Sequence, residues 1–390
     1  MTARAVAHRA RAAALLLAVP LGVRAQAAAD PWTPVVAEAE RAARRGAHDR
    51  AREAASRLLA ARAGAATAPA AARLAEGRAW QLLAAGNPQA VRNALAAYDA
   101  AAAADTLAPE PLLRLGALWL GAYNAPEARA AYRQALARAG TAAPWRAEAL
   151  LGLARTAAFD GRESPEALVR EALAAAPEHP GALALLARLQ LDAEAGDSAR
   201  ATAARAVAAA ADADSPGALE AWSVQGAVAW LLGDSATLRT ARAGAARLQP
   251  TLAALHLEQA ETAVRHRRYA EAAPLAARAV AGDSLTVRAL EVLGTTQLRL
   301  GEMAEGQAVL ARAFALDPFN VVQKNVLDLL DDLGRYRTID RGRFRLVAPA
   351  DEAELLAGLL LPLLEPAYDS LAARYGHVPA GPVRLELFRR

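Results

Sequence analysis

The feature that most constrains the fold is a pattern of paired amphipathic helices that recurs every 34 to 39 residues along most of the chain. Residues 290–318 show one unit clearly. Leu290, Leu293 and Gly294 fall on one face of a first helix, Gly301 marks a turn, and a second apolar helix follows. A single hairpin of this kind cannot bury its own apolar face, so the pattern predicts a row of stacked hairpins.

A small residue recurs where the two helices of each hairpin are expected to cross. From one hairpin to the next, the steps between these residues are 35, 39, 36, 35, 39, 34 and 34. A generic Ala-rich helical bundle is the alternative interpretation, but a bundle has no reason to keep such a spacing. The crossing positions that indicate a repeat array are Ala42, Gly77, Gly116, Gly152, Ala187, Gly226, Ala260 and Gly294.

These small residues and a closing proline give the chain its resemblance to a known family. Gly294, Gly306, Ala313 and Pro318 take the places that such residues have in the tetratricopeptide repeat (TPR), which the chain resembles. Gly306 stands where that family usually has Ala, and we expect it to weaken the second helix by about 1 kcal/mol. The resemblance implies an all-α, right-handed TPR superhelix of about eight hairpins over residues 28–334.

In the TPR family, the first helices line a concave groove that holds peptides or partner proteins, so the resemblance implies a protein or peptide partner. The predicted lining is mostly apolar, and it lacks the Lys/Asn cluster by which some family members hold a C-terminal carboxylate. Trp230 is the strongest candidate for a contact, because a large aromatic side chain in a groove is a typical anchor. The alternative role of these residues is packing between hairpins. The candidate groove contacts are Leu113, Leu120, Arg188, Leu191, Trp230, Leu257, Glu261, Glu291 and Leu298.

The first 27 residues have the pattern of a secretory signal peptide. Arg4, Arg9 and Arg11 precede an apolar run at 12–23, and Ala25-Gln26-Ala27 is typical of a cleavage site. An ordinary amphipathic helix is the alternative. The run is shorter than the roughly 20 apolar residues that a membrane span needs. Because the chain has no Cys for lipid attachment, we expect an exported protein, periplasmic or extracellular, without a membrane anchor after signal cleavage.

The charge of the chain comes mainly from this signal. The whole chain has 45 basic and 41 acidic residues, and residues 1–27 hold four Arg and no acid. Without them, the chain has 41 residues of each sign and a formal net charge of zero. Nothing in this balance predicts a nucleic-acid partner.

After a polar helix at 321–333, which we expect to cap the solenoid, the pattern changes near residue 342. Residues 343–347 and 383–388 alternate as strands do, and an apolar helix lies between them. Pro362 and Pro366 are expected to kink or split that helix. One helix and two strands make a poor domain, so we expect 342–390 to be a partial α/β segment of a longer chain.

This segment resembles the start of the peptidase MA-like (gluzincin) domains that follow TPR arrays in secreted bacterial proteins. The resemblance implies a zinc metallopeptidase whose H-E-x-x-H motif supplies two zinc ligands and a general base. That motif is not in this chain, so zinc is expected only if a downstream domain exists. The matching residues are 344–347, Tyr368, Tyr375-Gly376, Pro379 and 383–388.

The sequence offers no catalytic, cofactor-binding or metal-binding residues. None of its six His residues pairs with another at a spacing of four, and no phosphate-binding or nucleophile motif is present. We therefore expect an exported TPR scaffold for protein–protein interaction without catalysis in this segment. The alternative is the N-terminal portion of a secreted zinc metallopeptidase whose H-E-x-x-H region lies beyond residue 390. Assembly work at the cell envelope is a third, weaker option.

Overall fold

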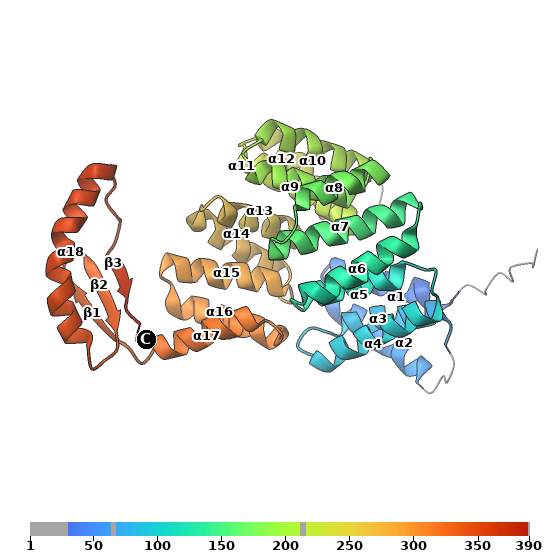
Figure 1. Ribbon diagram of the computed structural model, residues 1–390, viewed down its shortest axis with the longest axis horizontal. Helices are drawn as coiled ribbons and strands as arrows, with labels where there is room; N and C mark the ends of the chain where they lie inside the picture. The colour runs from blue at the N-terminus through green and yellow to red at the C-terminus, as the bar shows by residue number, and fades with distance from the viewer. Residues whose placement is uncertain (1–29, 64–67, 211–215, 389–390) are drawn as a thin grey trace, which may run out of the picture.

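The computed structural model describes residues 30–63, 68–210 and 216–388, so the predicted signal peptide at 1–27 lies outside the described residues. The described part contains eight helical hairpins, one further helix and a small α/β unit (Figure 1). The first helices of the hairpins are α1 (Trp32–Arg44), α3 (Ala70–Leu82), α5 (Glu110–Gly121), α7 (Ala143–Asp160), α9 (Pro180–Asp192), α11 (Pro216–Leu231), α13 (Ala253–Arg265) and α15 (Val287–Leu300).

The second helices pack antiparallel to the first ones across short turns. They are α2 (His48–Arg62), α4 (Pro88–Ala104), α6 (Ala125–Ala139), α8 (Pro165–Ala175), α10 (Gly196–Ala210), α12 (Ser235–Leu248), α14 (Tyr269–Gly282) and α16 (Met303–Leu316). α17 (Val321–Leu333) follows the last hairpin and packs on α16. The predicted all-α solenoid is therefore confirmed.

Every turn between a first and a second helix has one residue with left-handed backbone geometry. Glycine adopts this geometry without the steric cost that a Cβ atom brings. The glycines are Gly46, Gly86, Gly161, Gly233 and Gly301, and the three other positions are held by Tyr123, Glu194 and Arg267.

The crossing glycines allow the helices to approach closely. A Cβ atom on Gly152 would overlap the ring of Tyr132. A Cβ on Gly306 would lie 2.7 Å from Cδ2 of Leu298 and 2.9 Å from the carbonyl oxygen of Gly294. Gly306 therefore has a packing role that the family pattern, with its Ala, did not reveal.

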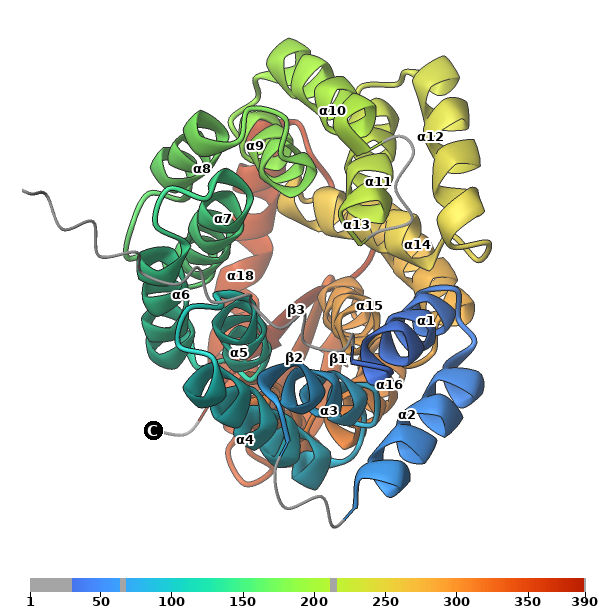
Figure 2. The ribbon, with the colours of Figure 1, turned by 90° about the vertical axis from the view of Figure 1, so that its right-hand side faces the viewer.

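The hairpins wind into one turn of a superhelix (Figure 2). Odd-numbered helices from α1 to α15 form the inner wall, and the second helices lie outside them. With α1 toward the viewer, the array proceeds clockwise as it recedes, so the superhelix is right-handed. The core between the hairpins consists largely of fully buried Ala and Leu side chains, and its largest cluster joins α9 to α13.

The C-terminal unit is a three-stranded sheet with one covering helix. β1 (Arg337–Arg341) is antiparallel to β2 (Phe344–Ala348), and β3 (Val383–Glu386) is parallel to β2. Leu346 at the centre of β2 pairs with Ile339 on one side and with Leu385 on the other. The sequence did not predict β1, because its exposed, charged side chains do not alternate with apolar ones in the way of a core strand.

α18 (Ala353–Tyr375) connects β2 to β3 and runs unbroken through Pro362 and Pro366, so the expected split does not occur. Both prolines are exposed, and the carbonyl groups that they leave unbonded can be hydrated there. α18 is long and apolar enough to cross a membrane by length and composition. Its Ala353, Ala357 and Leu361 are nevertheless buried in the cluster that it forms with the sheet.

The solenoid meets this unit through a small apolar cluster. Leu330 and Leu333 of α17 pack with Val347 of β2, whose side chain points away from α18. α17 therefore both ends the array and supports the sheet.

Candidate protein-binding site on the inner face

A pocket of about 310 Å³ lies on the inner wall of the superhelix. We call it the inner-face pocket. All ten of its lining residues come from first helices of hairpins, namely α1, α9, α11, α13 and α15. They are Arg44, Arg188, Leu219, Glu220, Ser223, Ala254, Leu257, Glu258, Glu261 and Arg288.

Arg188 lies at the centre of a network of ion pairs in the lining of this pocket. Its Nε and Nη2 donate to the two carboxylate oxygens of Glu258 at 2.8 and 2.7 Å, and its Nη1 donates to Glu220 at 2.7 Å. Arg155 of α7 donates to the other oxygen of Glu220 at 2.7 Å. Four first helices, α7, α9, α11 and α13, are therefore held together by one set of charge-assisted hydrogen bonds.

Electrostatics in this network favour the charged forms. Burial by itself raises the pKa of Glu220, but Arg155 and Arg188 outweigh burial and lower that pKa from 4.5 to about 2. Burial likewise acts to lower the pKa of Arg188, but Glu258 and Glu220 outweigh it and raise that pKa well above its usual value. Arg188 and Glu220 are therefore ionised at neutral pH.

Similar pairs continue along the inner wall. Arg288 of α15 donates to Glu261 of α13 at 2.6 Å, and at the other end Arg78 of α3 holds Glu40 of α1 at 2.9 and 2.7 Å. Six of the ten residues that line the inner-face pocket are charged. By residue type the lining is therefore more charged than expected, although the surface that it exposes is mostly apolar. The periodicity of one helix cannot reveal these ion pairs, because Arg188, Arg288 and Arg78 each bond a carboxylate on another hairpin.

The pocket brings together three of the predicted groove contacts, Arg188, Leu257 and Glu261. Glu291 lies elsewhere on α15 and is 8% exposed. Leu191 is buried in the cluster of α9 to α13, where it packs between hairpins.

The other predicted contacts also take part in packing. Leu113 and Leu120 of α5 are partly buried against α6 and α7. Trp230 is partly buried against α13 to α15, with the guanidinium of Arg268 4.8 Å from its ring centre. Leu298 packs with the cluster that joins α17 to β2.

Sequence reasoning missed Glu220, Glu258 and Arg155. The signal available was a lone charged residue within an otherwise apolar first helix, as with Glu220 in the segment Gly217–Val224. Such a residue is costly to bury without a partner, so each one predicts an ion pair. The sequence does not show which residue the partner is, because Arg155 and Glu220 are 65 residues apart and Arg188 and Glu258 are 70 apart.

The two ends of the superhelical turn touch along a line that we call the seam. There the turns after α1, α3 and α5 meet the segments 249–253, 282–291 and 316–323 (Figure 2). Gln249 Nε2 donates to the carbonyl oxygen of Arg44 at 2.9 Å, and His48 Nε2 lies 2.8 Å from Asp283 Oδ1. The backbone N–H of Gly86 donates to the carbonyl oxygen of Leu316 at 2.7 Å.

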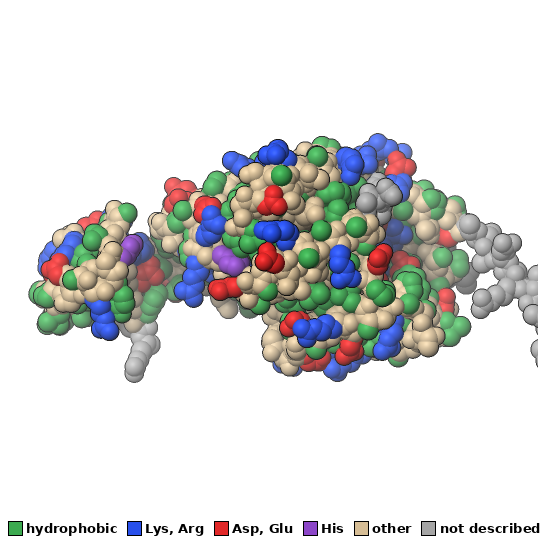
Figure 3. Space-filling view, turned by 90° about the horizontal axis from the view of Figure 1, so that it is seen from above, with side chains coloured by type: hydrophobic (Ala, Val, Ile, Leu, Met, Phe, Trp, Pro, Cys, Tyr) green, Lys and Arg blue, Asp and Glu red, His purple; other side chains and the backbone are tan. Residues whose placement is uncertain are grey.

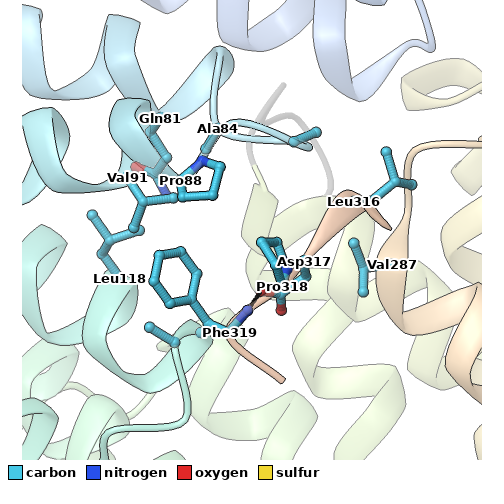
Figure 4. Close-up of a pocket in the computed structure, with 13 residues that line it drawn as sticks. Gln81, Ala84, Pro88, Val91, Leu118, Val287, Leu316, Asp317, Pro318 and Phe319 are labelled. Atoms are coloured by element: carbon cyan, nitrogen blue, oxygen red, sulfur yellow. Dashed lines mark hydrogen bonds between the residues drawn. The ribbon is translucent and has the colours of Figure 1, made fainter. Parts of the chain in front are cut away.

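Tyr123 makes the most developed contact of the seam. Its hydroxyl donates to Glu291 Oε1 at 2.9 Å and accepts from Asn320 Nδ2 at 2.7 Å. Burial first, and then the charge of Glu291, raise the pKa of the Tyr123 hydroxyl well above its usual value, so it stays protonated. Beside this contact lies a pocket of about 260 Å³ between Leu118 and Val91 on one side and Val287 and Leu316 on the other (Figure 4).

The outer surface shows no comparable feature on the face that Figure 3 presents. Basic and acidic side chains are interspersed there, without a large patch of one sign (Figure 3). Within the described residues, no group of three or more His, Asp or Glu side chains is arranged to hold a metal ion.

No protein-family model and no curated protein matches the sequence. Among solved structures, the chain is similar to the APC/C hetero-tetramer Cut9–Hcn1, with 12% identity over 76% of this chain and a TM-score of 0.42. It is also similar to yeast Tom70 (13% identity, 68% of this chain, TM-score 0.44). The chain spans 55% and 57% of the lengths of these two. A tetratricopeptide repeat protein from Parabacteroides merdae shares 17% identity over 63% of this chain and 94% of its own, with a TM-score of 0.40.

Proposed function

We propose that the chain is an exported scaffold that binds a protein partner on the inner face of its superhelix. The observation that supports this most is the composition of the inner-face pocket, whose lining comes from five first helices. Side chains as far apart in sequence as Arg44 and Arg288 face one space there. This arrangement suits a polypeptide that touches several hairpins at once.

The chemistry of the pocket indicates what kind of segment it accepts. Three Arg and three Glu line it, and ion pairs join Arg188 to Glu220 and Glu258, and Arg288 to Glu261. A surface of paired charges attracts neither sign strongly at long range. We therefore expect a partner segment with mixed polar and apolar residues, and an affinity that depends weakly on salt.

Site-specific photo-crosslinking in the native host tests this proposal. A photoreactive amino acid replaces Leu257, which lines the pocket, and in a second variant it replaces Ala204, which is exposed on α10. We expect a defined protein adduct from position 257 that is absent from position 204 and is reduced by Glu261→Arg. Adducts from position 204 alone would place the partner on the outer wall and contradict the proposal.

Export is a separate part of the proposal and is tested separately. Residues 1–40 are fused to an alkaline phosphatase that is active only outside the cytoplasm. We expect activity, and we expect Leu16→Arg, which interrupts the apolar run at 12–23, to abolish it. Activity that survives this change would contradict a signal peptide.

A second candidate function is that of a peptidase, in which the C-terminal unit is the first part of a peptidase MA-like domain. Supporting it is an apolar pocket of about 310 Å³ between α18 and β3, lined by Phe344, Tyr368, Leu371 and Leu385 among others. A further layer of structure over β3 would cover this pocket. Sequencing the coding DNA beyond Arg390 tests the idea. A continuation with H-E-x-x-H would support a zinc enzyme, and a continuation without it would remove this candidate.

A further inference from the structure

The seam differs from every other interface between hairpins in what holds it. Buried apolar clusters join each hairpin to the next, from α1–α3 through α9–α13 to α15–α17. Within the described residues, none of these clusters joins α1–α5 to α13–α17. The seam depends instead on a few polar contacts, and a pocket remains beside them (Figure 4). An interface of this composition opens before the apolar ones do.

We propose that the solenoid is a ring that opens and closes at the seam, and that the hydroxyl of Tyr123 stabilises the closed state. We call Tyr123 the latch. An open seam would admit a partner segment to the inner face from the side. A closed seam would leave only the two ends of the ring as entrances. The proposal concerns access, and it stands whether or not the inner-face pocket proves to be the binding site.

The backbone of Tyr123 supports this role. Its φ of 62° is the left-handed geometry that glycine holds in five of the eight turns, and a bulky residue there is strained. Glu194 and Arg267 occupy the same position in other hairpins, and among the described residues neither makes a hydrogen bond or ion pair across the seam. The Tyr123 hydroxyl, in contrast, bonds residues on the opposite side of the seam, Glu291 and Asn320.

Further hydrogen bonds hold the two partners of Tyr123 in place. Glu291 Oε1 also accepts from Gln323 Nε2 at 2.7 Å, and Glu291 Oε2 accepts from Arg288 at 3.2 Å. Asn320 is the N-cap of α17 and accepts from the backbone N–H of Gln323 at 3.0 Å. Loss of the tyrosine hydroxyl therefore leaves a charged, largely buried carboxylate with one donor fewer, which favours the open state.

Pulsed electron spin resonance measures the opening directly. Because the chain has no Cys, Asp49→Cys and Ser284→Cys provide two unique spin-label sites. Both residues are exposed, and each lies next to a member of the His48–Asp283 contact across the seam. Tyr123→Phe removes only the latch hydroxyl. Tyr98→Phe is the matched control, because it removes a hydroxyl that bonds Gln81 within one hairpin at 2.8 Å.

We expect Tyr123→Phe to raise the population with a long label-to-label distance about tenfold over the parent, since hydrogen bonds to charged groups have about this effect on an equilibrium. We expect Tyr98→Phe to leave the distance distribution unchanged. Far-UV circular dichroism establishes that both variants are folded. If Tyr123→Phe gives the parent distribution, or if Tyr98→Phe opens the ring equally, the latch is refuted.

Discussion

Replacement of Arg188 by Met tests whether the ion network organises the inner wall. Met keeps much of the length and the apolar stem of Arg but has no charge. In the variant, Glu220 retains only Arg155, and Glu258 retains only Arg265, which lies 3.8 Å away. Both carboxylates have limited exposure, with side-chain exposed fractions of 20% and 7%. Removal of one partner from a buried ion pair costs about 3 to 5 kcal/mol, because the remaining charge stays buried.

The pKa of Glu220, which Arg155 and Arg188 lower together, adds a pH dependence to this loss. A shift from 4.5 to about 2 is about 2.5 pH units, or about 3 kcal/mol of folding free energy at neutral pH. Because the folded-state pKa is the lower one, this stabilisation is present above pH 4.5. It is lost as the pH falls from about 4.5 toward about 2. We therefore expect the difference between parent and Arg188→Met to be largest at pH 7 and to shrink over that range.

Urea denaturation followed by circular dichroism and by tryptophan fluorescence measures the free energy of unfolding at pH 7, 4 and 3. Urea is preferred because guanidinium chloride would screen the charges. Agreement between the two probes establishes whether the array unfolds in one step. Arg170→Met is the control, since Arg170 and Glu166 form an exposed pair that contributes at most about 1 kcal/mol. Equal losses in the two variants, or a loss at Arg188 that does not change with pH, would refute the reasoning.

Two further substitutions test the packing and the turns. Gly306→Ala introduces the usual residue of the TPR family, and its higher helix propensity alone should stabilise the fold by about 1 kcal/mol. We nevertheless expect thermal unfolding to show a net destabilisation of about 1 to 2 kcal/mol. The reason is that the new Cβ atom meets Leu298 and the carbonyl oxygen of Gly294. Gly358→Ala, with nothing within 4 Å of the new atom, is the control and should stabilise. Glu194→Gly should raise the free energy of unfolding by a few tenths of a kcal/mol, because relief of left-handed strain slightly exceeds the added chain entropy. A clear loss of stability there would show that Glu194 makes an essential contact.

The parts of the fold that depend on local signals could be predicted from the sequence. Small residues at the crossings, glycines in the turns and the changed pattern near residue 342 indicated the hairpins and the α/β unit. β1 was missed because all but one of its side chains are exposed. The apolar side chains of this strand pair come mainly from β2. The unbroken α18 shows that proline costs less on a hydrated helix face than in a buried one.

The candidate site was harder to predict because its contacts are distant in sequence. Arg188 and Glu258 are 70 residues apart, and Tyr123 and Glu291 are 168 apart. A repeat pattern specifies how each hairpin packs on the next, but it does not specify how many hairpins complete a turn. The charged inner wall and the seam both depend on that curvature, which arises from many small rotations between neighbours.

The seam also has a consequence for how the chain folds. An array with contacts only between adjacent repeats has a low contact order, and its structure can spread from any starting point. The contact between His48 and Asp283 spans 235 residues, so it requires both ends of the array to be in place. Refolding should therefore show a fast phase of helix formation and a distinct last step, in which the two ends dock.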